Sequence, residues 1–272
     1  MTSSSGAKNI IVSGGHSGIG LELTKRLVGD GHRVGLIVRS RDRANGVDGV
    51  SDVFVADLAD QAQVRSVAND IVTRWKVVDV LFNNAGVLLD DLYHSPQGNE
   101  MHFEVNTLSP YLLTTLLQPA LDASSAPVVV NTVTDGLHNQ RSLKLDELIS
   151  PSKFRKLIGS YLQSKLALTV LMADLGASWV DVRIASVTPG PNKTAMTGGS
   201  GMPALLKPLR SLMFAAPSKG AGLLYDAAFS SDHEIQGYVA KGKKRNMKVT
   251  LSVDDKTQLL SHLNTGYPPA AL

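Results

Sequence analysis

The stretch Ser13-Gly14-Gly15-His16-Ser17-Gly18-Ile19-Gly20 decides the fold of this chain. It lies between a short apolar run, 9–13, and residues 19–28, where apolar side chains recur at helical spacing. Its glycines form a G-x-x-x-G-x-G pattern, and glycine lets backbone N–H groups and the positive end of a helix approach a pyrophosphate. The stretch therefore predicts a strand–turn–helix unit that binds a dinucleotide. The alternative interpretation is a helix packed tightly on a strand without a ligand.

Outside this turn, predicted strands and helices alternate along the chain. The expected strands cover 33–38, 53–56, 77–82, 128–133, 182–187 and 236–240, and the expected helices cover 61–74, 100–121, 159–177 and 220–229. Alternation of this kind produces parallel βαβ units with right-handed crossovers. We therefore expect an α/β protein with a doubly wound parallel sheet, the Rossmann fold. After a flexible start at 1–8, a single domain covers 9–272, with a substrate loop at about 190–215.

The composition favours one soluble domain and excludes several functions. The 272 residues are 43% hydrophobic and 19% charged, which suits a large core and not a disordered chain or a coiled coil. The net charge of +3 is too small to indicate nucleic-acid binding. Without cysteine the chain has no disulfide, thiolate nucleophile or cysteine-ligated zinc, and its histidines lack the spacing of a metal site. No apolar run approaches the ~20 residues of a membrane-spanning helix and no signal peptide is recognisable, so we expect a cytoplasmic protein.

The end of the second predicted strand indicates which dinucleotide binds. NAD sites place an acidic residue about 20 residues after the glycines, on the ribose 2′-hydroxyl. This chain has Arg39 and Ser40 at that place. A guanidinium forms charge-assisted hydrogen bonds with a phosphate, so Arg39 favours NADP(H) over NAD(H). The alternative is a solvated surface arginine.

Candidate binding residues follow the third and fourth predicted strands, at the edge where such a sheet binds its ligand. Asp57 and Leu58 follow the third strand, and Asn84, Ala85 and Gly86 follow the fourth. The Asp57 carboxylate is a candidate acceptor for the adenine amino group. Asp and Asn also cap helices and turns, and that interpretation stays open.

A tyrosine and a lysine, Tyr161 and Lys165, lie one turn apart at the start of the predicted helix 159–177. A tyrosine transfers protons near neutrality only when its pKa, ordinarily about 10, falls by several units. A neighbouring ammonium and a positively charged nicotinamide ring both favour the phenolate. The pair therefore predicts a proton-transferring tyrosine, although Y-x-x-x-K also occurs on exposed helix faces.

Several motifs in their order along the chain resemble the short-chain dehydrogenase/reductase family, over about residues 8–245. The matching residues are Gly14, Gly18, Gly20, Asn83, Asn84, Ala85, Gly86, Asn106, Tyr161, Lys165, Pro189, Gly190 and Thr194. Within the family, the long segment 135–156 and the sequence Ser164-Lys165-Leu166-Ala167 are similar to the branch of retinol dehydrogenases and protochlorophyllide reductases.

The resemblance implies a role for each matching residue. Tyr161 is then the general acid in reduction and the general base in oxidation. Lys165 holds the nicotinamide ribose and lowers the pKa of the tyrosine, and Asn106 braces the helix that carries a proton-relay water. The residues expected to contact the rest of the cofactor are Pro189, Gly190 and Thr194 at the nicotinamide end, and His16, Ser17 and Ile19 in the glycine turn. The resemblance also implies a homodimer or a homotetramer.

One position departs from the family pattern. The family ends its fifth strand with a serine whose hydroxyl orients the substrate oxygen, whereas this chain has Asn131-Thr132-Val133-Thr134-Asp135. We align Thr134 with that serine, since threonine keeps a hydroxyl donor. Its methyl group narrows the pocket and restricts χ1.

These observations predict an NADP(H)-dependent oxidoreductase that reduces a carbonyl, or oxidises a secondary alcohol, on a small to medium apolar molecule. Two alternatives stay open. Because Thr134 replaces the family serine, the chain is alternatively an imine reductase, a dehydratase or a cyclase on the same fold. A non-catalytic protein that senses NADPH would bind the cofactor without turning it over.

Overall fold

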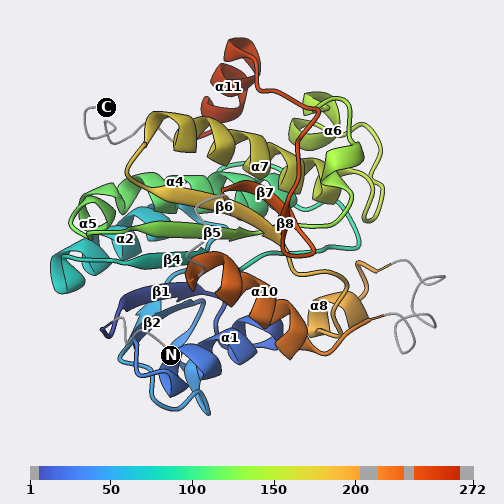
Figure 1. Cartoon of the computed structure of the whole chain (residues 1–272). Coiled ribbons are helices and arrows are strands. Elements are labelled where there is room, and N and C mark those ends of the chain that lie inside the picture. Colours follow the sequence, from blue (N-terminus) through green and yellow to red (C-terminus); the bar gives the residue numbers. More distant parts are fainter. Residues whose placement is uncertain (1–5, 203–213, 230–235, 264–272) are drawn as a thin grey trace.

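The chain folds around one sheet that is covered by helices on both faces (Figure 1). The computed structural model describes residues 6–202, 214–229 and 236–263. Its strands are β1 (Asn9–Ser13), β2 (Arg33–Val38), β3 (Asp52–Val55), β4 (Val80–Asn83), β5 (Val128–Thr132), β6 (Arg183–Thr188), β7 (Gly237–Ala240) and β8 (Lys243–Lys244). They are ordered β3-β2-β1-β4-β5-β6-β7-β8, and every neighbouring pair is parallel except β7 and β8. The predicted doubly wound sheet is confirmed, with one antiparallel edge strand that the sequence did not predict.

The sheet is buried on both faces because its strands are apolar almost throughout. In β1, Ile11 belongs to the core on one face, while Ile10 and Val12 belong to the core on the other. This division follows from the alternation of side chains along a strand. Residues Asn83 of β4 and Asn131 of β5 are paired in register, so the carboxyl ends of these strands lie level with each other.

The helices lie in two layers (Figure 1). One face is covered by α1 (Gly18–Gly29) and α10 (Pro217–Phe229), and the other by α2 (Gln61–Trp75), α4 (Ser109–Leu116), α5 (Gln118–Asp122) and α7 (Ser160–Ser178). Shorter elements are η1 (Arg41–Ala44), η3 (Leu137–Asn139), α6 (Leu145–Ile149), α8 (Ala195–Gly198) and α11 (Val253–Leu260). Among the residues that the structure describes, no helix combines the length and the apolar character needed to cross a membrane.

The helix predicted at 100–121 is divided into several pieces. It begins with α3 (Met101–Phe103), continues as a π-helical segment η2 (Glu104–Leu108), and then forms α4 and α5. Pro110 lies at the start of α4, as its missing N–H predicts. The π-helical segment carries Asn106 and buries it completely. π-turns within helices are frequent at functional sites.

The two long irregular segments contain short helices. Segment 135–156 includes η3 and α6, and the segment after β6 includes α8. Both leave the carboxyl edge of the sheet, where ligands bind in this architecture. The substrate loop expected at about 190–215 lies partly outside the described residues.

Candidate active site

The glycine turn has the backbone conformation expected of a dinucleotide site. Gly14 and Gly18 have φ angles of +67° and +53°, in the region that favours glycine. A Cβ atom on Gly20 would lie 2.2 Å from the Gly14 carbonyl oxygen, so α1 can begin this close to β1 only with glycine there. Ser17 directly precedes α1 and Ile19 lies in its first turn. The N-terminus of α1 is therefore placed at the carboxyl end of β1, where a pyrophosphate binds in such sheets.

Asn84 holds this turn from the end of β4. Its Nδ2 atom donates to the carbonyl oxygens of Ser13 and Gly14, both at 3.2 Å. The Ser13 hydroxyl oxygen accepts the backbone N–H groups of Asn84 and Ala85, both at 3.1 Å. These bonds join the ends of β1 and β4, so the predicted residues Asn84 and Ala85 shape the crevice between them.

A basic cluster lies beside the turn, at the end of β2. Burial and the nearby guanidinium groups of Arg43 and Arg39 lower the pKa of the His16 imidazole. The Nδ1 atom of His16 is buried and has no hydrogen-bond partner within the described ranges. Ser40 directly precedes η1, which carries Arg43. An orphaned buried nitrogen near two guanidinium groups fits a bound group that carries negative charge and acceptor oxygens.

Asp57 and Leu58 make contacts within the protein. The Asp57 Oδ1 atom accepts the N–H of Ala59 at 2.9 Å, and the Asp57 N–H donates to Gln63 Oε1 at 2.9 Å. Leu58 is buried, and its carbonyl oxygen accepts the Ser109 hydroxyl. These are the turn contacts that the sequence left open as an alternative, and the contact of Asp57 with adenine stays a prediction.

Lys165 lies buried at the carboxyl ends of β4 and β5, with 5% of its surface exposed. Its Nζ atom donates to the Thr132 carbonyl oxygen at 2.9 Å. Burial lowers the pKa of this ammonium to about 8. A Cβ atom on Gly86 would lie 3.0 Å from Asn106 Oδ1 and 3.2 Å from Lys165 Nζ. The missing side chain at Gly86 therefore leaves a cradle in front of both polar groups, which fits a ribose with hydroxyls to bind.

Asn106 braces the segment after β4 against α7. Its Oδ1 atom accepts the N–H of Val87 at 2.8 Å, and its Nδ2 atom donates to the Val87 carbonyl oxygen at 3.0 Å and to Ser164 Oγ at 3.2 Å. The Asn106 amide group therefore connects the backbone at Val87 to α7 directly.

Tyr161 and Thr134 meet through a hydrogen bond between their hydroxyl groups. Burial raises the pKa of the Tyr161 phenol, and the smaller effect of the Thr134 hydrogen bond lowers it. The pKa of Tyr161 thus lies above its ordinary value, although proton transfer near neutrality needs the opposite shift. Within this pocket, a positive charge beside the phenol oxygen would reverse the shift.

The segment after β6 reaches back to the glycine turn. A Cβ atom on Gly18 would lie 3.1 Å from Thr194 Cγ2, so Thr194 packs directly on the start of α1. Buried Asn192 donates through Nδ2 to the carbonyl oxygens of Pro189 and Gly190, both at 2.8 Å. The residues predicted for the two ends of the cofactor therefore share one edge of the sheet.

A pocket of about 510 Å³ lies next to Thr134. It is lined by Asp135, Gly136, His138, Asn139, Pro191, Ala240, Lys241 and Arg245. Behind it, the Tyr238 hydroxyl donates to the Thr134 carbonyl oxygen at 3.3 Å. Burial and the Asp135 carboxylate raise the pKa of Tyr238 to about 12, which keeps this donor protonated. The pocket adjoins Thr134 through the next residue, Asp135, while Tyr161 and Thr134 themselves do not line it.

The sequence interpretation missed Arg43, Asn192 and Tyr238. The run Arg39-Ser40-Arg41-Asp42-Arg43 did contain a signal, because a turn can bring alternate arginines to one side. Asn192 follows Pro-Gly-Pro, and asparagine commonly bonds nearby backbone groups in such turns. Nothing in the sequence around Tyr238 distinguishes it from a core tyrosine.

A glycine turn, a lysine cradle and a Tyr161–Thr134 pair on one edge of a doubly wound sheet are the arrangement expected of a nicotinamide-dependent oxidoreductase. A family model described as short chain dehydrogenase matches residues 8–142. Polyprenol dehydrogenase of Danio rerio is 31% identical, over 92% of this chain and 83% of its own. Human retinol dehydrogenase 14 is 30% identical, over 85% and 76%. The chain belongs to the short-chain dehydrogenase/reductase family, on its retinol-dehydrogenase-like branch.

Solved structures show the same fold. A short-chain dehydrogenase from Burkholderia cenocepacia, in complex with NADP, has a TM-score of 0.67 at 23% identity and covers 86% of this chain and 95% of its own. An alcohol dehydrogenase from Thermococcus sibiricus, complexed with 5-hydroxy-NADP, has a TM-score of 0.67 at 19% identity and covers 89% and 100%.

Proposed function

We propose that this chain is an NADP(H)-dependent oxidoreductase that reduces a carbonyl, or oxidises a secondary alcohol, on a small to medium apolar molecule. The observation that carries the proposal is the Tyr161–Thr134 hydrogen bond beside the Lys165 cradle. It places a proton donor and a second hydroxyl where one substrate oxygen can meet both.

A nicotinamide dinucleotide held by the glycine turn and Lys165 would supply the hydride for reduction of the carbonyl carbon, or the hydride acceptor for oxidation of the alcohol carbon. Tyr161 gives its phenolic proton to the substrate oxygen in reduction and takes the proton back in oxidation. Thr134 donates a hydrogen bond to the same oxygen as negative charge develops on it. Lys165, which faces the space above Gly86, holds the ribose, and Asn106 braces the backbone after β4 against α7.

The preference for NADP(H) is supported by the cluster of His16, Arg39 and Arg43. A 2′-phosphate supplies the charge that both guanidinium groups attract and the acceptor oxygens that a buried His16 N–H can reach. A ribose 2′-hydroxyl supplies no charge. We therefore assign the 2′-phosphate to this cluster.

The proposal of an apolar substrate is supported by the relatives named for retinol and polyprenol. It is also supported by the pocket beside Thr134, where Gly136, Pro191 and Ala240 contribute apolar lining. Apolar walls with a few placed polar groups are typical of small-molecule sites.

The test is the variant Tyr161→Phe, assayed with NADPH and a panel of apolar aldehydes and ketones. We expect turnover to fall on the order of 1000-fold, because the proton donor is lost, while NADPH affinity stays within about threefold. Tyr225→Phe, which removes a phenol from α10, is the matched control and should keep full turnover. Full activity of Tyr161→Phe would refute the assignment. NADPH binding by the wild type without turnover of any panel member would favour the sensing alternative.

A further inference from the structure

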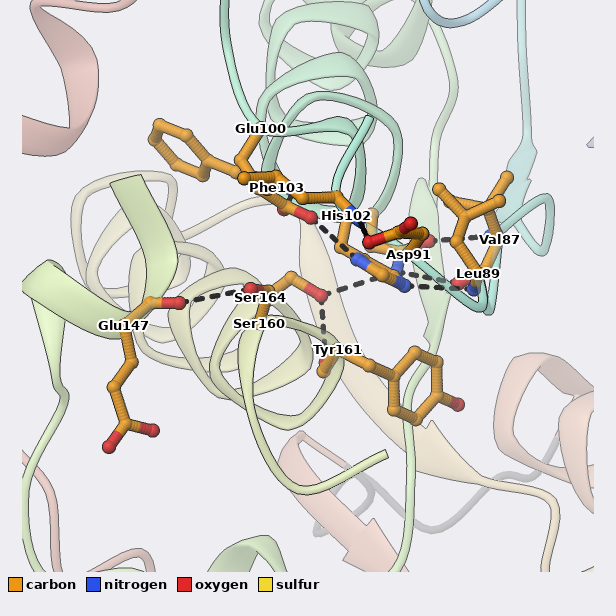
Figure 2. Close-up of polar contacts among 12 residues, drawn as sticks. Val87, Leu89, Asp91, Glu100, His102, Phe103, Glu147, Ser160, Tyr161 and Ser164 are labelled. Carbon is orange, nitrogen blue, oxygen red and sulfur yellow. Dashed lines mark hydrogen bonds and ion pairs between the residues drawn. The ribbon is translucent and has the colours of Figure 1, made fainter. Parts of the chain in front are cut away.

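A fully buried acid–histidine pair lies one turn before Asn106 and has no part in the chemistry above. Glu100 is 0% exposed and His102 is 1% exposed. His102 Nδ1 lies 2.7 Å from Glu100 Oε1, and the other carboxylate oxygen of Glu100 accepts the N–H of Phe103 at 2.9 Å. On the opposite side of the ring, His102 Nε2 accepts the backbone N–H of Leu89 at 3.0 Å (Figure 2).

These partners fix where the imidazole proton lies. The Leu89 N–H can only donate, so Nε2 of His102 must present a lone pair. The Glu100 carboxylate can only accept, so Nδ1 carries the proton. A neutral ring with its proton on Nδ1 is the state that satisfies both contacts. Glu100 therefore holds His102 in one tautomer and one orientation, and through it holds the backbone at Leu89.

The same ring contacts the helix that carries the proton donor. The His102 ring meets the Tyr161 ring edge-on, with centroids 6.0 Å apart at an interplanar angle of 78°. It stacks on Phe154 from the segment before α7, at 6.1 Å and 21°. Figure 2 shows His102 between the Leu89 segment and Tyr161. One buried side chain thus contacts three segments that surround the reacting groups.

The backbone at Leu88 and Leu89 in turn supports the segment after β6. A Cβ atom on Gly201 would lie 2.2 Å from the Leu88 carbonyl oxygen and 2.9 Å from the Leu89 carbonyl oxygen. The neighbouring residue Ser200 hydrogen-bonds the Asp90 carboxylate through its side chain, and its carbonyl oxygen accepts Lys156 Nζ at 2.9 Å. We call Leu88–Asp90, Phe154 and Ser200–Gly201 the substrate-side wall. A shift of Leu89 would therefore also displace Ser200–Gly201, which pack on it, relative to Tyr161.

We propose that His102, oriented by Glu100, is a positioning residue that sets the substrate-side wall against Tyr161. The inference rests on the proposed function in that the wall then borders the substrate. It assigns His102 no proton transfer. Because His102 contacts neither the glycine turn nor the basic cluster, its loss should change substrate binding more than cofactor binding.

The test compares His102→Asn with His102→Gln. Asparagine places an amide nitrogen where Nδ1 lies and can still donate to Glu100, but it has no atom where Nε2 lies, so the Leu89 N–H loses its acceptor. Glutamine is long enough to donate to Glu100 and to accept from Leu89. Both variants keep a polar group for the buried carboxylate, so both should fold, and only their reach to Leu89 differs.

Two readouts follow. In His102→Asn we expect the Leu89 amide to exchange with deuterium on the order of tenfold faster than in the wild type, with His102→Gln close to the wild type. The KM for the carbonyl substrate should rise about five- to tenfold in His102→Asn, with the KM for NADPH and kcat little changed, and glutamine should restore it. His32→Asn, on the other side of the sheet, is the control.

Equal Leu89 exchange in the Asn and Gln variants would overturn the inference, and so would a parallel rise of the KM for NADPH. The exchange measurement needs no turnover. Faster Leu89 exchange in a chain that reduces no carbonyl would support the positioning by His102 and would count against the proposed function alone.

Discussion

The cofactor side and the substrate side of this site are built in different ways. On the cofactor side, Gly14, Gly18 and Gly20 lie within one short stretch, and backbone conformation sets its shape. On the substrate side, the wall comes from three segments that are far apart in the sequence. A buried side chain, His102, holds two of them, and the third, Ser200–Gly201, packs on the wall backbone at Leu88 and Leu89. A bulkier side chain in the glycine turn should therefore abolish cofactor binding, whereas a substitution in the substrate-side wall should only weaken substrate binding.

The largest effect on cofactor binding is expected from Gly20→Ala, which tests the cofactor side. The new Cβ atom would lie 2.2 Å from the Gly14 carbonyl oxygen and 2.5 Å from Asn84 Nδ2, so the turn must shift. We expect a cost of about 3 kcal/mol, seen as a loss of NADPH affinity of more than about 100-fold by fluorescence titration. Gly29→Ala, at the other end of α1 with nothing within 4 Å, should bind NADPH normally. Equal NADPH affinities of the Gly20→Ala and Gly29→Ala variants would show that the turn does not require glycine at position 20.

The next largest effect is expected at Thr134, which belongs to the chemical centre between the two sides. Thr134→Ala removes the hydroxyl that bonds Tyr161, and we expect kcat to fall on the order of 100-fold. Thr134→Ser keeps the hydroxyl and relieves the methyl group, so its kcat should stay within about threefold of the wild type. Similar kcat values for the alanine and serine variants would show that the Thr134 hydroxyl does not contribute to turnover.

A smaller effect, on stability, is expected at Lys165. Its pKa falls from an ordinary 10.5 to about 8 on burial, a cost of about 3 kcal/mol to the folded state when the amine is charged. Lys165→Met removes that cost but leaves the Thr132 carbonyl oxygen without its donor. We therefore expect a net gain in the free energy of unfolding of about 1–2 kcal/mol at neutral pH, together with loss of activity.

The pH dependence of this gain has a definite sign. Below pH 8 Lys165 is charged in both states, and the folded state carries the whole cost. Between about 8 and 10.5 the unfolded state binds more protons, so the stability of the wild type rises with pH. The advantage of Lys165→Met should therefore shrink from pH 7 to about pH 9.5 in urea titrations. A constant difference would contradict a depressed pKa.

The smallest effect is expected at the basic cluster. Arg39→Ala should raise the KM for NADPH about tenfold and leave the KM for NADH almost unchanged, because one charge-assisted bond to a phosphate is lost. Arg43→Ala should do the same to a lesser degree. Equal changes in the KM for NADPH and the KM for NADH would show that the 2′-phosphate does not bind to this cluster.

The difference between the cofactor side and the substrate side also explains which features the sequence could predict. The sheet, its order of elements and the glycine turn were predictable because apolar periodicity and glycine spacing are local signals. The alignment of Thr134 with the family serine is supported by its bond to Tyr161. The short antiparallel strand Lys243–Lys244 was missed because its residues are exposed lysines without a strand pattern.

The contacts of His102 were not predictable for a different reason. They depend on which backbone group and which rings, far away in the sequence, lie opposite the side chain after folding, and no spacing in the sequence encodes this. The pKa of Tyr161 shows the same limit, because the neighbouring Lys165 predicted a lowered value, whereas burial, a tertiary property, raises it. Local signals located the reacting groups, and long-range packing sets their environment.

The π-helical segment Glu104–Leu108 has a consequence for how this region can change. It contains about one residue more per turn than an α-helix in the same place would, carries Asn106, and joins α3, which holds His102, to α4. Deleting a single residue here would change the π-turn into an α-helical turn and leave α3 and α4 in nearly the same relative orientation, because a π-turn holds one extra residue in about the same rotation. The extra residue is therefore accommodated within the segment, and its removal would change the position of Asn106 while sparing the helices on either side.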